Sequence, residues 1–345
     1  GDLAKDVAKD IEISLSPALD DYLTHKKEVD PNAYMAYMRG QYHWHYLSAI
    51  GMDSAEYYFN VSRSIDPDYA LAYAGLASVA LVRAQFGIIP FHEAAIDNIK
   101  YLDKAVGLDS SLSQVHFLSA CFNTWGLWNF REAEADFLKA IDKNPNYALA
   151  HIYYAQLLCI LNRYNDAESH SETAWLLDPF NTLIKIVRSQ NQNFMRKPGD
   201  AIPVLEEIRK SEPYNGFMLS TLRTSYHITG EYDKAIEAWK DSYIGDTLAY
   251  NILSEGYKKS GYRYALRLLG DYTIKKSETE FITPWRICTI YTRAGDNAKA
   301  IEWLEMAFHA HDQYMPFIST DPIFDELKTD PRFLTILKRM NLGGG

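Results

Sequence analysis

The chain has 345 residues, of which 47% are hydrophobic and 23% are charged, so it holds enough apolar material for one large or two ordinary domains. Its 35 lysines and arginines against 45 aspartates and glutamates give a formal charge of −10, which disfavours binding to nucleic acid and to anionic membranes. No apolar run of about 18 residues occurs, so no transmembrane helix is expected.

The cysteines and the start of the chain favour a reducing compartment. Cys121, Cys159 and Cys288 are too few and too far apart for a disulfide framework, and they are expected to be buried apolar residues. The first residues lack the basic start and the apolar stretch of a signal peptide. A cytoplasmic location is therefore predicted.

Residues 1–32 have an amphipathic pattern and are predicted to cap the helices that follow. The next helix contains the aromatic run Gln41–Tyr46, which includes His43 and His45. Two residues apart on a helix, these histidines point roughly 200° apart and cannot share a metal. The run is predicted to pack against the second helix and the N-terminal segment, with a ligand-contacting face at Tyr42, His45 and Tyr46 as the alternative.

An internal repeat follows. Five similar stretches begin at residues 60, 103, 138, 172 and 206, so the period is about 34 residues with one insertion after the first stretch. An alanine stands twelve residues before the proline that four of the stretches share. These prolines are Pro67, Pro145, Pro179 and Pro213.

Each repeat has the pattern of a helical hairpin. Apolar residues before the proline recur at helical spacing, as in EAEADFLKAI, and the proline suits only the first turn of the next helix. Short polar breaks at 161–166, 229–234 and 294–299 separate the two helices of a unit. Gly230 and Gly295 in these breaks suit a left-handed helix C-cap.

The pattern resembles the tetratricopeptide repeat, which has small residues, an aromatic residue and a proline at fixed positions. Ala133, Phe137, Ala140 and Pro145 match it one for one. The resemblance implies an all-α fold, namely an α-solenoid of about eight helical hairpins over residues 33–311 that forms a right-handed superhelix with capping helices at both ends.

Residues 312–345 are predicted to form C-terminal capping helices and a tail. Asp321-Pro322 and Asp330-Pro331 are two helix starts, and PRFLTILKRM has the pattern of a helix that closes the last apolar surface. Residues 32–44 and 324–342 also resemble the ends of the tetratricopeptide region that follows the effector domain in bacterial winged-helix regulators and class III adenylate or guanylate cyclases. This resemblance implies a regulatory module of a larger signalling or transcription-regulatory protein.

The resemblance also implies a concave groove lined by the first helix of each unit. Its middle is expected to be aromatic and amide-rich with little charge, although some of these side chains could instead pack between neighbouring units. The groove residues carried over from the family positions are Phe122, Trp125, Gln156, Gln190, Asn193, Phe194, Thr224 and His227. None of the residues at the fifth family position is basic, so the carboxylate clamp of chaperone-binding relatives is not expected.

Two further features have open interpretations. The insertion at 84–93 contains Ile88, Ile89 and Phe91, which are predicted either to cover a core or to meet a partner. His309, His311 and Asp312 lie together near a helix end, where a capping or solvated role is favoured over metal binding.

No catalytic motif, phosphate-binding loop or metal motif occurs, so no cofactor is expected. The sequence therefore predicts a non-catalytic protein-interaction module that binds a peptide or protein segment, which could be an effector domain of its own parent protein. One alternative is a small-molecule sensor with a pocket near Phe122, Trp125 and Phe194. A remote alternative is an all-α enzyme, which would need two carboxylates in a deep cleft.

Overall fold

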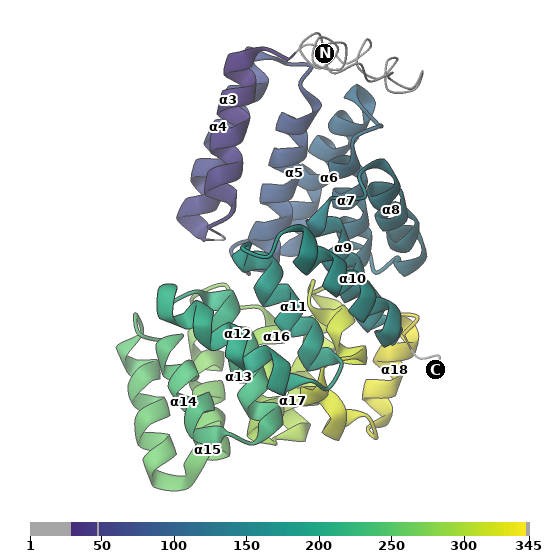
Figure 1. The fold of residues 1–345 in the computed structure, drawn as a ribbon. Coiled ribbons are helices and arrows are strands. Elements are labelled where there is room, and N and C mark those ends of the chain that lie inside the picture. The colour runs from purple at the N-terminus through teal and green to yellow at the C-terminus, as the bar shows by residue number, and fades with distance from the viewer. Residues whose placement is uncertain (1–28, 47, 343–345) are drawn as a thin grey trace.

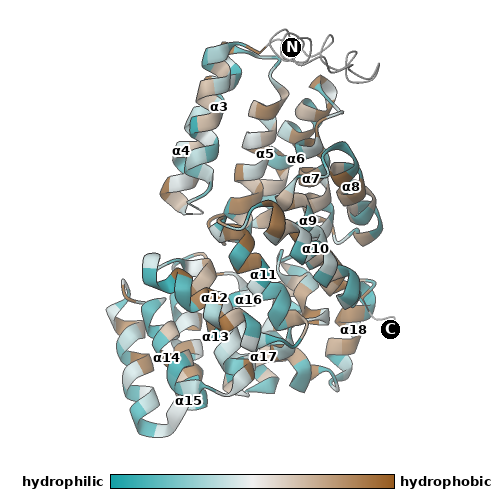
Figure 2. Cartoon of the chain, viewed as in Figure 1, coloured by the Kyte–Doolittle hydropathy of each residue, from teal (hydrophilic) through white to brown (hydrophobic). Residues whose placement is uncertain are grey.

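The computed structural model describes residues 29–46 and 48–342, and within these ranges the regular structure is entirely helical (Figure 1). The predicted N-terminal capping segment falls almost wholly on residues 1–28, outside the described ranges. Consecutive helices pair as antiparallel hairpins, as the sequence predicts. Both hydrophobic and hydrophilic residues occur along the helices (Figure 2), as expected for helices with one buried face.

The first four hairpins run from α3 to α10, over residues 31–177. The third of them contains a short π-helix, η1, between its two α-helices. The elements are α3 (Pro31–Trp44) with α4 (Ala49–Ile65), α5 (Ala70–Gln85) with α6 (Phe91–Leu108), α7 (Ser113–Cys121) and η1 (Phe122–Gly126) with α8 (Phe130–Lys143), and α9 (Ala148–Ile160) with α10 (Tyr164–Leu177).

The later hairpins continue the same arrangement. In α15, Ser260 and Gly261 have non-helical backbone angles, and Gly261 has a φ of 78°, so this long element is a hairpin of two helices. The elements are α11 (Thr182–Phe194) with α12 (Pro198–Ser211), α13 (Gly216–Thr229) with α14 (Tyr232–Asp241), the two halves of α15 (Thr247–Ser277), and α16 (Pro284–Ala294) with α17 (Asn297–His309).

Small residues and left-handed turns set the hairpin geometry. Gly230 and Gly295 end α13 and α16 in the left-handed conformation, with φ of 75° and 71°, as the sequence predicts. In the first hairpins, a Cβ on Gly40 or Gly75 would lie within 2.7 Å of the Phe59 ring. Glycine at these two positions therefore lets the buried ring of Phe59 fit between α3, α4 and α5.

Two aromatic residues of the insertion at 84–93 contact residues that are far away in the sequence. The ring of Phe86 lies 6.2 Å from that of Phe217 on α13, and the ring of Phe91 lies 5.4 Å from that of His311. Both rings are half-buried, whereas Ile88 is exposed. Of the two interpretations of this insertion, the structure therefore supports covering a core for Phe86 and Phe91.

The chain beyond α17 folds back along the solenoid instead of only closing its end. Residues 311–327, called here the C-terminal segment, contain two short 3-10 helices, η2 (Met315–Ser319) and η3 (Pro322–Leu327). η2 contacts α9 and η1, and η3 contacts α13 and α16. Figure 1 shows this yellow part of the chain beside the teal middle helices. α18 (Pro331–Arg339) packs on α17, and η3 contacts the same helix, so this part of the chain also covers the last hairpin.

Specific polar contacts hold the C-terminal segment in place. The Ser319 hydroxyl donates a hydrogen bond of 2.8 Å to the Ile160 carbonyl, and His311 Nε2 donates one of 2.6 Å to the Gly126 carbonyl. The His311 ring also stacks on Trp128, with 3.7 Å between centroids. His311 is thus a packing residue and the neighbouring Asp312 is buried, so the predicted capping or solvated role is wrong for these two residues, whereas His309 is exposed in the last turn of α17, as predicted.

Candidate binding surface

The described structure separates the predicted groove residues into an exposed set on α3 and a largely buried set in the middle. On α3, the side chains of Tyr42 and Tyr46 are 61% and 58% exposed, and His45 is exposed as well. The two tyrosine hydroxyls are hydrogen-bonded at 2.5 Å. Trp44 is buried and His43 stacks on Tyr58 of α4, so within this run packing and exposure alternate around the helix.

The exposed face of α3 continues toward its N-terminus. Met35 and Met38 are also exposed, and helical spacing places them on the same side of α3 as Tyr42, His45 and Tyr46. Tyr46 lines a cleft of about 370 Å³ with Phe86, Tyr214 and Phe217. An apolar stripe on α3 thus leads into a hollow between the first hairpin and α13.

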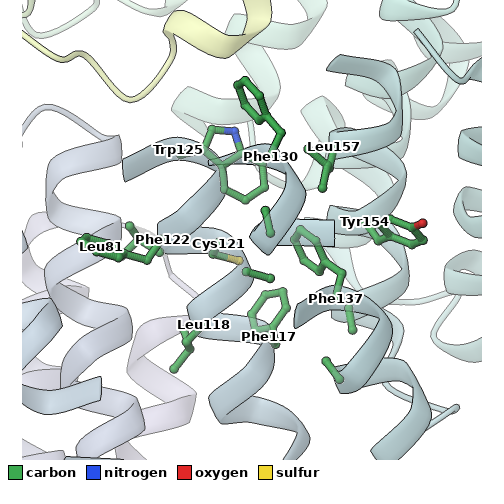
Figure 3. Packing of buried hydrophobic residues seen from close by; sticks show 14 of the residues in the cluster. Leu81, Phe117, Leu118, Cys121, Phe122, Trp125, Phe130, Phe137, Tyr154 and Leu157 are labelled. Atoms are coloured by element: carbon green, nitrogen blue, oxygen red, sulfur yellow. The ribbon is translucent and has the colours of Figure 1, made fainter. Parts of the chain in front are cut away.

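The aromatic residues predicted for the middle of the groove are core residues. Trp125 is 3% exposed, and Phe122 and Phe194 are equally inaccessible. Figure 3 shows Phe122 and Trp125 inside a cluster with Phe117, Phe137 and other apolar side chains. Phe194 is covered by Phe317 of the C-terminal segment, with 5.2 Å between ring centroids. None of these three rings is open to a partner in this structure.

The predicted amide side chains join neighbouring units to each other. Gln156 donates a hydrogen bond of 2.7 Å to Gln190, one repeat further along the chain. Asn193 donates to the Thr221 carbonyl at 3.3 Å and accepts from the Ser225 hydroxyl at 3.0 Å. Such pairing satisfies buried polar groups that would otherwise destabilise the fold. The interpretation of packing between units therefore holds for Gln156 and Asn193.

A cavity of about 460 Å³ lies between α11, α13, α16 and the C-terminal segment. Three of the predicted groove residues besides Phe194 line it, namely Gln190, Asn193 and Thr224. Aromatic side chains from several elements form much of the remaining wall. They are Phe86, Tyr214, Phe217, Trp239, Tyr243, Trp285, Tyr314 and Phe317.

Three arginines that were not among the predicted groove residues line the same cavity. Arg293 is buried and donates a hydrogen bond of 2.6 Å to the Thr224 hydroxyl. Arg223 is half-buried, and its guanidinium lies 4.0 Å from the centroid of the Trp239 ring. Arg286 also lines the cavity and is exposed. The expectation of a groove with little charge is therefore wrong for this half of the solenoid. Arg286 and Arg293 are seven residues apart on one helix, a spacing that places both on one face.

The arginines lower the basicity of their neighbours. Burial, together with the nearby charge of Arg293, lowers the pKa of Arg223 to about 9. Burial and the charges of Arg293 and Arg263 lower the pKa of His227 to about 3. His227 lies beside the stacked rings of Tyr232 and Tyr262, at 6.1 and 5.9 Å between ring centroids, and is not among the residues that line the cavity.

The depressed pKa of His227 predicts a pH-dependent stability. In the unfolded state His227 takes up a proton below about pH 6.5, whereas in the folded state it does so only near pH 3. Protonation therefore favours the unfolded state as the pH falls below 6.5, and the free energy of unfolding decreases. At pH 5 the loss amounts to about 2 kcal/mol. We expect His227→Phe to lose that much less stability than the wild type between pH 7 and pH 5 in urea titrations. Equal losses in the two proteins would contradict a neutral buried His227.

The described residues contain neither a cluster of metal ligands nor a membrane-spanning helix. No group of three or more histidine, cysteine, aspartate or glutamate side chains is placed to hold a metal ion within residues 29–46 and 48–342. In the same ranges, every helix is too short or too polar to cross a membrane.

The fold and this surface define an all-α repeat protein of paired helical hairpins. The first helices of the hairpins form what is called here the inner face, and the C-terminal segment fills part of it by contacting α9, α13 and α16. The family model of the tetratricopeptide repeat matches residues 137–169, which span the end of α8, α9 and the first half of α10. A search of curated proteins found no match.

Solved structures with similarity include several tetratricopeptide repeat proteins. Yeast Tom70 is 13% identical, with 92% of this chain and 69% of that chain covered and a TM-score of 0.47. PilW, a type IV pilus biogenesis factor, is 13% identical, with coverage of 64% and 95% and a TM-score of 0.44. A tetratricopeptide repeat protein from Parabacteroides merdae is 14% identical, with coverage of 79% and 99% and a TM-score of 0.40. These comparisons give no support to the resemblance to winged-helix regulators and cyclases.

Proposed function

We propose that the chain is a non-catalytic interaction module that binds a segment of a partner protein on its inner face. The observation that carries this proposal is that the inner face already holds polypeptide. The C-terminal segment lies against α9, α13 and α16 and is fixed by side-chain contacts such as Ser319 with Ile160 and Phe317 with Phe194.

The part of the inner face that stays open is the binding surface in this proposal. Met35, Met38, Tyr42 and Tyr46 offer an apolar stripe at helical spacing, and His45 adds a polar group beside it. Exposed aromatic residues next to a cleft are typical anchors of protein interfaces. A partner helix or extended segment with apolar side chains fits such a stripe, with one side chain seated in the cleft beside Tyr46.

The partner's identity is a separate hypothesis. The resemblance of residues 32–44 and 324–342 to the regions that follow winged-helix and cyclase domains favours an effector domain of a longer parent protein in a signalling or transcription-regulatory system. A non-catalytic role in the cytoplasm accords with that hypothesis.

The proposal is tested by affinity capture of partner proteins on the full chain and on matched variants of it. Met38→Ser/Tyr42→Ser alters the open stripe, and Ile96→Ser/Leu176→Ser alters two apolar side chains on α6 and α10 that are also exposed. Neither pair is buried, so both variants are expected to keep the wild-type melting temperature. We expect a partner protein to bind the wild type and the control pair, and to lose at least about tenfold in affinity for the α3 variant once purified. Equal binding to all three proteins, or no partner at all, would sink the proposal.

A second candidate function is supported by the cavity. A hollow of about 460 Å³ with aromatic walls and a few convergent polar groups has the size and lining of a small-molecule site. It is bounded by the C-terminal segment, so a free chain segment would have to displace that part of the fold to enter. A small-molecule sensor is therefore the alternative, with its pocket beside Phe194 and away from Phe122 and Trp125.

A further inference from the structure

We infer that the cavity between α13, α16 and the C-terminal segment binds a small organic anion, a carboxylate or phosphate ester with an aromatic or apolar body. The inference deepens the second candidate function and rests on it. It is carried by the arrangement of Arg223, Arg286 and Arg293 around one hollow, together with the aromatic side chains that line the same hollow.

The positive charge of the cavity has no ion-pair partner in the described protein. No carboxylate of the described residues forms an ion pair with Arg223, Arg286 or Arg293; their hydrogen bonds go to Ser242, Tyr243, the Thr289 carbonyl and Thr224. Buried charges are normally paired, because removing a cation from water without a counter-ion is costly. An unpaired set of this kind is typical of a site whose counter-ion is a ligand.

The nearby carboxylates do not cancel this charge. Asp241 is paired with Arg209, and Asp246 lies 2.9 Å from Lys276. Asp321 is the remaining acidic residue in the wall, and burial raises its pKa even though Arg293 opposes that effect. With three arginines against Asp241 and Asp321 in its wall, the cavity keeps an excess of positive charge at neutral pH.

Unused hydrogen-bond donors point to the same conclusion. Within the described residues, the guanidinium of Arg223 bonds to a protein acceptor through Nη1 and that of Arg286 through Nη2. The Nε atoms of Arg223 and Arg293 have no partner there, but they are inaccessible in this structure, so a ligand would be held through the Nη atoms. Guanidinium groups with free edges are suited to bidentate bonds with carboxylate or phosphate oxygens.

The walls define the rest of the ligand. Trp239 stacks under Arg223, and Trp285, Tyr314 and Phe317 form apolar surface in the same hollow. An inorganic ion would leave that surface unused, whereas an anion with a ring or short apolar chain would cover it. The volume of about 460 Å³ is within the range of pockets for small organic ligands.

The test uses the full chain, with phenyl phosphate and benzoate as the anionic probes and benzyl alcohol as a neutral probe of similar size, at constant ionic strength. Trp239 and Trp285, two of the seven tryptophans, line the cavity, so intrinsic fluorescence is expected to change on binding, and thermal denaturation reports on binding to the folded state. We expect a saturable fluorescence change and a higher melting temperature with at least one anion and neither effect with benzyl alcohol. The stronger anion identifies the headgroup as phosphate or carboxylate.

Two variants locate the effect. Arg223→Gln/Arg286→Gln removes charges from the half-buried and exposed parts of the cavity, and Arg267→Gln removes a partly exposed arginine of α15 outside it. We expect the first variant to weaken binding of the anion at least about tenfold and the second to leave it unchanged.

The inference is overturned if neither anion gives a saturable response up to about 10 mM, or if the double variant binds as the wild type does. Equal binding of benzyl alcohol would also overturn it, while leaving the cavity as a site for neutral ligands. These outcomes are independent of partner capture through α3, so failure here is distinguishable from failure of the protein-interaction proposal.

Discussion

Replacing Phe317 with alanine is expected to lower the free energy of unfolding by about 3–5 kcal/mol. The side chain is almost fully buried and joins the C-terminal segment to α11 through Phe194 and to its own segment through Tyr314, at 5.2 and 5.8 Å between ring centroids. Its removal leaves a cavity in the inner face that the surrounding helices cannot fill. Urea titration of the wild type and the variant measures the difference.

The matched control for Phe317→Ala is Leu334→Ala on α18, where the side chain is half exposed and the loss should stay below about 1 kcal/mol. If Phe317→Ala also costs less than about 1 kcal/mol, the C-terminal segment is not packed as described.

The second large effect is expected at Trp125. Trp125→Ala should destabilise the fold by about 3–5 kcal/mol, because the indole is enclosed in the cluster around η1 and meets Tyr153 edge-on at 5.5 Å. Trp125→Phe should cost clearly less, since the indole nitrogen has no hydrogen-bond partner among the described residues. Both variants are compared with the wild type by urea titration.

A groove residue in contact only with a partner would behave differently. If Trp125→Ala kept the stability of the wild type while losing a partner, the assignment of Trp125 to the core would be wrong. If stability falls as expected, loss of a partner by this variant says nothing about docking, and the exposed residues of α3 are the informative positions to mutate.

The repeat pattern was sufficient to predict the hairpins, because it depends on local chemistry. Gly230 and Gly295 end their helices in the left-handed conformation that glycine favours. Asp330 caps α18 at Pro331, as the Asp-Pro pair indicates. Such signals act within a few residues of each other, so one sequence carries them. The superhelical handedness stays a prediction.

The filled inner face could not be predicted in the same way, because it depends on contacts between distant residues. Ser319 meets Ile160, 159 residues away, and Arg293 meets Thr224, 69 residues away. The apolar stretch Tyr314–Ile318 was a usable signal, since it lacks a helical period yet is too apolar to lie in water. The arginines gave a weaker signal, because arginine on a helix usually faces solvent.

The central claim is that the C-terminal segment is an integral part of the inner face, so that partners meet the open surface on α3. Hydrogen exchange of the full chain tests it most directly, through the amides of Tyr314, Phe317, Thr320 and Phe324. Phe317 and Thr320 donate main-chain hydrogen bonds within this segment, to Tyr314 and Phe317. The account predicts protection of these amides comparable to that of α16. Exchange at the rate of an unstructured peptide, with α16 still protected, would contradict it.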